Sequence, residues 1–122
     1  MKTIAVVEDN ADNRLLMRAI LGNTYAVVEF ETATAAWEAF QRQRPDVVVL
    51  DISLPVMDGT ELLKKIRADM ALRDLPVIAL TAHAMAGDRE KFLAQGFNDY
   101  VTKPILDEEI ILKAIERLVD HD

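Results

Sequence analysis

The stretch VVVLDISLPVMDG, residues 47–59, decides the fold of this chain, because an apolar run of strand formers ends there in a carboxylate. Val47–Leu50 is typical of a β-strand buried on both faces, as in a parallel sheet. Asp51 follows that strand directly, and a lone carboxylate at such a place does not belong in a core. We therefore expect Asp51 to lie at a strand end where a functional site needs a charge.

Two other strand-like runs also end in charged residues. Residues 4–7 (IAVV) run into Glu8 and Asp9, and residues 99–102 (DYVT) lead to Lys103. The carboxyl ends of parallel strands lie at one edge of an open α/β sheet, and ligand sites are found outside that edge. The sequence therefore predicts that three acids and one ammonium group converge there.

Apolar, β-branched runs alternate with segments of helical period along the whole chain, which indicates a parallel sheet covered by helices on both faces. The expected strands are Thr3–Val7, Ala26–Phe30, Val47–Leu50, Val77–Leu80 and Tyr100–Thr102. The first expected helix follows Asn10, the second starts near Thr34, the third follows Asp58-Gly59-Thr60 and ends before Asp74, the fourth covers Asp88–Gln95, and the fifth starts from Asp107. The second strand has the pattern of a sheet edge. The fourth helix, short and polar, should be the least firmly held element.

The composition favours one domain over residues 1–122, with no output domain. The chain has 51% hydrophobic residues, no cysteine and a net charge of −7. That charge opposes a phosphate backbone, so we do not expect direct binding to nucleic acid. No apolar run is long enough to span a membrane, and the N-terminus leads into a strand rather than a signal peptide, so we expect a cytoplasmic protein. There is also no Walker loop and no GxGxxG fingerprint for a nucleotide.

The predicted acidic edge needs a cation, because Glu8, Asp9 and Asp51 would repel one another strongly at neutral pH. Hard oxygen ligands specify Mg²⁺, which takes one or two carboxylates, keeps several waters and shares its remaining positions with a phosphoryl group. An aspartate can accept that group covalently if the phosphoryl oxygens are neutralised. Lys103 would serve this purpose, and Thr81 would add a hydroxyl donor at the same edge.

Four motifs in register resemble the receiver domains of two-component response regulators: residues 7–10 (VEDN), residues 49–59 around Asp51, Thr81 with Ala82, and residues 100–104 (YVTKP). The resemblance covers the whole chain, and with no output domain it favours a stand-alone regulator, as in chemotaxis. It implies a flavodoxin-like (βα)5 fold, a doubly wound sheet of five parallel strands in the order 2-1-3-4-5.

The resemblance also implies a role for each site residue. Asp51 would accept a phosphoryl group from a histidine of a sensor kinase or of a phosphotransfer protein. Asp9, Asp51 and the Ser53 carbonyl would ligate Mg²⁺, Glu8 would act through water, and Mn²⁺ could substitute for Mg²⁺. Thr81 and Lys103 would contact the phosphoryl oxygens. Tyr100 would change its rotamer when Thr81 moves. The bond between Lys103 and Pro104 is expected to be cis, since only an X-Pro bond makes cis accessible.

The expected partners are the kinase or phosphotransfer protein and a downstream protein target. Leu15, Leu16 and Met17 turn through about 200° of helix, so at least one should be exposed near Asp9 and contact the kinase. Pro104 and Ile105 would complete that surface, whereas the target would read the face formed by the fourth helix, the fifth strand and the fifth helix. We expect a monomer, with a weak dimer left open, that catalyses only its own phosphorylation and dephosphorylation.

Several alternatives stay open. A phosphatase of the haloacid-dehalogenase type also uses a strand-terminal aspartate, but its second acid is replaced here by Ser53. A pseudo-receiver that only binds a partner is the second alternative. His83 either screens the acyl phosphate from water or is an exposed loop residue. Tyr100 could be an ordinary half-buried aromatic instead of a switch. Trp37 is expected to pack in the core. The sequence does not name the kinase, the target, the pathway or the lifetime of the phosphoryl group.

Overall fold

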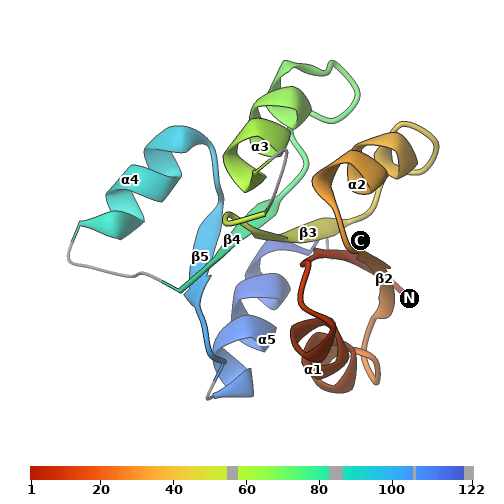
Figure 1. Ribbon diagram of the computed structural model, residues 1–122, viewed down its shortest axis with the longest axis vertical. Coiled ribbons are helices and arrows are strands. Elements are labelled where there is room, and N and C mark those ends of the chain that lie inside the picture. Colours follow the sequence, from red (N-terminus) through yellow and green to blue (C-terminus); the bar gives the residue numbers. More distant parts are fainter. Residues whose placement is uncertain (55–57, 83–86, 106, 120–122) are drawn as a thin grey trace.

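The computed structural model describes residues 1–54, 58–82, 87–105 and 107–119, and these form a five-stranded parallel sheet (Figure 1). The strand order is β2-β1-β3-β4-β5, which confirms the predicted order and places the second strand at an edge. The strands are β1 (Thr3–Val7), β2 (Ala26–Phe30), β3 (Val47–Asp51), β4 (Val77–Thr81) and β5 (Asp99–Thr102). Every strand that was expected is present, and the observed bounds differ by at most one residue at either end.

Helices cover both faces of the sheet, so that the two buried faces form two separate cores (Figure 1). One face carries α1 (Ala11–Leu21) and α5 (Glu108–Leu118), and the other carries α2 (Ala33–Phe40), α3 (Gly59–Ala68) and α4 (Asp88–Gln95). Trp37 of α2 is half-buried against the second of these cores, as expected, and the Lys65 ammonium lies 5.6 Å from its ring centroid. No helix among the described residues is long and apolar enough to cross a membrane.

The helices differ in how they begin. Side chains of Asn10, Thr32, Asp58 and Asp107 each accept a backbone N–H at the start of α1, α2, α3 and α5. Within the described residues, α4 alone begins without such a bond, at Gly87 with φ of 90°, and Phe92 is its only buried residue. A glycine at the N-cap costs a helix only a few tenths of a kcal/mol relative to a side-chain cap, so the expectation that α4 is the least firmly held helix rests on its single buried residue and stays a prediction.

The third helix ends at Ala68, several residues earlier than expected, because the chain folds back around Arg67. The Arg67 guanidinium donates from Nη1 to the Leu75 carbonyl at 2.6 Å, and from Nη2 to the Gly96 carbonyl at 2.7 Å and to Asn98 Oδ1 at 2.9 Å. Nε also donates to Gly96, and Nη1 to the carbonyl of Arg73. We call this group of contacts the Arg67 node; it joins α3 to the segments that lead into β4 and β5.

The outer edge of β2 is partly covered by a side chain of α1. Hydrogen bonds from Ala26 N–H and to the Phe30 carbonyl face β1, so the alternate residues of β2 present their backbone groups outward. Arg18 donates from Nη2 to the Val27 carbonyl at 3.2 Å and from Nε to Glu29 Oε2 at 2.7 Å. A charged side chain therefore occupies part of the free edge.

Candidate functional site

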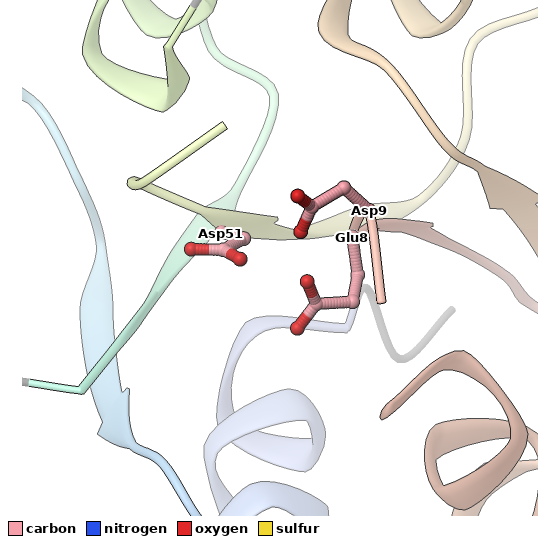
Figure 2. A group of neighbouring side chains, drawn as sticks. All are labelled: Glu8, Asp9 and Asp51. Atoms are coloured by element: carbon pink, nitrogen blue, oxygen red, sulfur yellow. The ribbon is translucent and has the colours of Figure 1, made fainter. Parts of the chain in front are cut away.

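Three carboxylates converge at the carboxyl edge of the sheet because β1 and β3 are parallel neighbours in register. Val7 at the end of β1 pairs with Leu50 of β3, so the residues that follow, Glu8 and Asp9, lie beside Asp51. Each of the three acids offers one oxygen, and these oxygens lie within 4.8 Å of one another. Figure 2 shows the three carboxylates turned toward a common space.

Lys103 supplies a positive charge to this cluster from the end of β5. Its Nζ lies 2.9 Å from Asp51 Oδ2 and 3.2 Å from Glu8 Oε1. Its N–H donates to the Thr81 carbonyl at 2.7 Å, which ties the residue to the end of β4. The bond between Lys103 and Pro104 is cis, as expected. The four charged groups predicted for this edge are therefore brought together.

Burial makes the electrostatics of the cluster unusual, because Glu8 is 0% exposed and Asp51 is 1% exposed, whereas Asp9 is open to solvent. Burial raises the pKa of Glu8 to about 7, and the neighbouring Asp51 contributes to the rise. Burial also opposes the charge on Asp51, but hydrogen bonds with Glu8, with the Ser53 N–H and with Lys103 hold its pKa below the ordinary value. Asp51 is therefore the ionised member of the buried pair, and Glu8 holds a proton for part of the time near neutral pH.

The cluster fits a hard divalent cation. Its donors are carboxylate oxygens, the ligand type that Mg²⁺ and Mn²⁺ prefer, and one ammonium group does not balance three carboxylates. A cation of charge two at this place would also favour the ionised form of Glu8. Asp9, Asp51 and, through water or directly, Glu8 are the side chains that would hold it.

The remaining residues expected at the site lie around this cluster. Ser53 follows Asp51 and donates its N–H to Asp51 Oδ1 at 2.9 Å; its expected carbonyl role stays a prediction. Thr81 is buried at the end of β4, next to Thr102 in register. Tyr100 is half-buried, and its ring centroid lies 5.5 Å from that of Phe92 in α4, so this tyrosine joins β5 to α4. His83, residues 55–57 and His121 lie outside the described residues.

Two polar residues at this edge, and a third at the opposite end of β5, were not identified from the sequence. Asn13 donates from Nδ2 to Glu8 Oε1 at 3.0 Å, and Arg14 donates from Nη1 to the Glu8 carbonyl at 2.8 Å. Asp99 of β5 is nearly buried and pairs with Arg89 of α4 at 3.1 Å and with Arg117 of α5 at 3.2 Å. The signal for the first two was available: both follow the acid pair at the start of an amphipathic helix, within one turn of the site.

The expected kinase-contact surface needs one correction. Leu15 is 68% exposed and Leu16 is 39% exposed, which confirms that part of this apolar run faces solvent. Met17 is 1% exposed and packs in the core between α1, α5 and the sheet, so the expectation that it contacts a partner is wrong. Pro104 and the half-buried Ile105 line a hollow of about 180 Å³ at the start of the β5–α5 connection.

Comparisons with known proteins agree with this geometry. The family model of the response regulator receiver domain matches residues 4–116. The polar-differentiation response regulator DivK of Brucella anthropi is 37% identical over 105 residues, which are 85% of this chain and 85% of DivK. The sensor protein GacS of Pseudomonas syringae pv. syringae is 40% identical over 111 residues, which are 88% of this chain but only 12% of GacS. The solved receiver domain of the sensor histidine kinase PA1611 of Pseudomonas aeruginosa PAO1, with magnesium coordinated in its active site cleft, is 37% identical, has a TM-score of 0.85 and covers 96% of each chain.

Proposed function

Because the chain belongs to the family of response regulator receiver domains, we propose that it accepts a phosphoryl group on Asp51 from a phosphohistidine. The single observation that carries this proposal is the placement of Asp51: ionised, buried and 2.9 Å from the Lys103 ammonium, in a cluster with two further carboxylates. An ionised carboxylate is a nucleophile, and the ammonium beside it can neutralise charge on incoming phosphoryl oxygens.

The proposed step exchanges one phosphorus bond for another. The P–N bond of the phosphohistidine breaks, the imidazole keeps the electron pair, and a carboxylate oxygen of Asp51 forms the P–O bond of an acyl phosphate. Lys103 and the Thr81 hydroxyl would contact the phosphoryl oxygens. Mg²⁺, when bound, would neutralise those oxygens further, and its support here is the carboxylate cluster and the magnesium found in the similar PA1611 receiver.

The phosphoryl donor would be a sensor histidine kinase or a histidine phosphotransfer protein. We expect such a donor to contact the exposed Leu15 and Leu16, together with Pro104 and Ile105, which line a hollow after β5. A role in a phosphorelay is in line with the similarity to DivK, which is named a response regulator, and to part of the sensor protein GacS. We expect a cytoplasmic monomer that passes on its signal without turning over an external substrate.

Phosphorylation would change the surface formed by α4, β5 and α5, and a downstream protein would bind there. A phosphoryl group at Asp51 would draw Thr81 toward it, and Tyr100 would turn inward into the space that Thr81 leaves. Since Tyr100 packs against Phe92 of α4, its movement would change the packing of α4, which begins without a side-chain cap. A downstream protein would distinguish the two states there.

The proposal is tested by incubating the protein with Mg²⁺ and acetyl phosphate and measuring the intact mass. One added phosphoryl mass is expected for the unmodified chain and none for Asp51→Asn. Asp99→Asn is the matched control, because it also neutralises a nearly buried aspartate of the sheet but lies away from the site. If Asp51→Asn is labelled as fully as the unmodified chain, Asp51 is not the acceptor.

Two alternatives predict other results. A chain that binds partners without accepting a phosphoryl group would gain no mass under any Mg²⁺ concentration. A phosphatase of the haloacid-dehalogenase type would release free phosphate from p-nitrophenyl phosphate over many turnovers, which the proposed function does not. The absence of a second acid two residues after Asp51, where Ser53 stands, disfavours this second alternative.

A further inference from the structure

We propose that Asn13 is a positioning residue that holds the Glu8 carboxylate in the orientation needed for Mg²⁺ binding. This inference rests on the proposed function, since it assigns a role at the same carboxylate cluster. Asn13 lies in the first turn of α1, next to the site but on a different element from any of the three acids. It touches the cluster only through Glu8 in the described structure.

The contact is a hydrogen bond from a side chain whose own backbone is fixed. Asn13 Nδ2 donates to Glu8 Oε1 at 3.0 Å, and the Asn13 N–H donates to Asn10 Oδ1 at 3.0 Å, which is the cap of α1. The cap sets the first turn of the helix, and the turn aims the Asn13 amide at Glu8. The contact therefore forms because Glu8, at the end of β1, is followed closely by a helix whose start is fixed by a cap.

Among the described residues, two other groups donate to the Glu8 carboxylate, and neither is suited to the role of Asn13. Lys103 Nζ lies 3.2 Å from the same oxygen, Oε1, but it is also bound to Asp51 and would turn toward the phosphoryl oxygens during transfer. The Asn10 N–H reaches the other oxygen, Oε2, at a longer distance of 3.3 Å. Asn13 is thus the short contact to this carboxylate that has no second task at the site.

The chemistry of an amide suits this role better than that of an ammonium. An amide donates a hydrogen bond and carries no net charge, so it orients the carboxylate without reducing the negative charge that attracts a cation. Partners that orient ligand groups in this way typically contribute 10- to 100-fold to metal affinity. We expect a loss in that range when the Asn13 amide is removed.

The neighbouring Arg14 offers a contrast within one turn of helix. Its Nη1 donates to the main-chain carbonyl of Glu8 at 2.8 Å, so it fixes the backbone and not the carboxylate. Removal of Arg14 should therefore lower stability with and without metal, whereas removal of the Asn13 amide should act on metal affinity. Comparing variants of Arg14 and Asn13 therefore distinguishes a contact that stabilises the backbone from a contact that orients the Glu8 carboxylate.

The test is calorimetric titration of Mg²⁺ into the unmodified protein, Asn13→Ala, Asn13→Gln and the matched control Asn23→Ala, which removes an exposed amide in the turn after α1. We expect the Kd to rise at least about 10-fold in Asn13→Ala, to recover in part in Asn13→Gln, which keeps the amide, and to stay constant in the control. The metal-free melting temperature of Asn13→Ala should not fall, since alanine is the better helix former. The Mg²⁺ concentration for half-maximal labelling by acetyl phosphate should rise in parallel, with the rate at saturating Mg²⁺ unchanged.

The outcomes that overturn the inference differ from those that overturn the proposed function. An unchanged Kd in Asn13→Ala, or a Kd that rises only together with a fall in the metal-free melting temperature, removes the positioning role and leaves the phosphoryl acceptor in place. If the unmodified protein itself binds no Mg²⁺ and gains no phosphoryl mass, the proposed function fails first.

Discussion

The two ends of the sheet carry polar clusters that are built in opposite ways. At the carboxyl edge, Glu8 and Asp51 are buried together, share one ammonium and have pKa values displaced in opposite directions. At the amino edge, the Arg67 guanidinium is surrounded by neutral oxygens: backbone carbonyls and one amide. The cluster at the carboxyl edge has three carboxylates for one ammonium, and its Glu8 changes protonation near neutral pH. In the Arg67 node, each oxygen acceptor receives an N–H of the guanidinium.

This difference separates a site for chemistry from a structural joint. A buried group whose hydrogen bonds are complete gains little from a ligand, while buried carboxylates in excess of their counter-charges gain much from a cation. Burial lowers the pKa of Arg67 as well, so a displaced pKa alone does not separate the two clusters. The functional edge is marked by several carboxylates crowded around one ammonium, and the joint by a single charge whose hydrogen bonds are complete. The four predictions that follow are ordered from the largest expected effect to the smallest.

Replacing Lys103 should have the largest effect and should act on function. Lys103→Met removes the ammonium shared by Asp51 and Glu8, so phosphorylation by acetyl phosphate at saturating Mg²⁺ should slow by about 100-fold, the usual loss for one electrostatic donor. Lys91→Met, at an exposed lysine of α4, is the control and should label at the normal rate. A rate within about threefold of normal for Lys103→Met would contradict the role given to this ammonium at the functional edge.

Replacing Arg67 should act on stability and leave the functional edge intact. Arg67→Met removes the donor for the carbonyls of Gly96 and Leu75 and for Asn98, so the free energy of unfolding should fall by about 2 to 4 kcal/mol. Urea unfolding measures this loss, with Arg73→Met as the exposed control. Mg²⁺ affinity should be unchanged; a large change in affinity would show that the two ends of the sheet are coupled.

Metal should remove most of the pH dependence of stability. Burial, and then Asp51, raises the pKa of Glu8 from 4.5 to about 7, so between these pH values the folded protein holds a proton that the unfolded chain has lost. Stability of the metal-free protein should therefore fall as pH rises from 5.5 to 8, by a few degrees in melting temperature, since about 1 kcal/mol moves Tm by roughly 4 °C in a small domain. Saturating Mg²⁺ should remove most of the fall, because the cation favours ionised Glu8. An equal slope with and without Mg²⁺ would place Glu8 outside the metal site.

The smallest effect on stability is expected for single replacements of the two exposed arginines that pair with Asp99. Arg89 and Arg117 both pair with Asp99, so either single change to alanine should cost less than about 1 kcal/mol, as exposed ion pairs do. The double variant leaves the nearly buried Asp99 without either arginine and should cost more than the two single changes added together. Strict additivity in a double-mutant cycle would mean that the arginines do not share Asp99.

The sequence predicted the fold well because the signals for it are local and periodic. Most strands are apolar runs, every helix except α4 begins with a side-chain cap within the described part of the chain, and the strand order follows from the family resemblance. The end of α3 at Ala68 was missed because it depends on the Arg67 node, whose partners lie up to 31 residues away along the chain. Periodicity carries no information about such a contact.

The same limit explains which site residues were found. Glu8, Asp9, Asp51 and Lys103 follow strand ends, so the parallel sheet alone brings them together. Met17 was misassigned because a run of three apolar residues shows that one side chain is exposed but not which one. Its spacing to the buried Ile20 and Leu21 would have placed it inward.

Asn13 and Asp99 were missed for a different reason. A polar residue at the start of a helix is usually read as part of its cap, and the direction of the Asn13 amide depends on the position of β1. Asp99 is held by arginines from two separate helices, so its burial cannot be seen from its own strand.

The contact of Arg18 with β2 has a consequence for solubility. An open strand edge can template the addition of a strand from another chain, which is the first step toward aggregates and fibrils. Here a newcomer would have to displace the guanidinium from the Val27 carbonyl and break its pairing with Glu29 before it could bond to that part of the edge. Arg18 therefore hinders the addition of a strand from another chain at the otherwise open edge of β2.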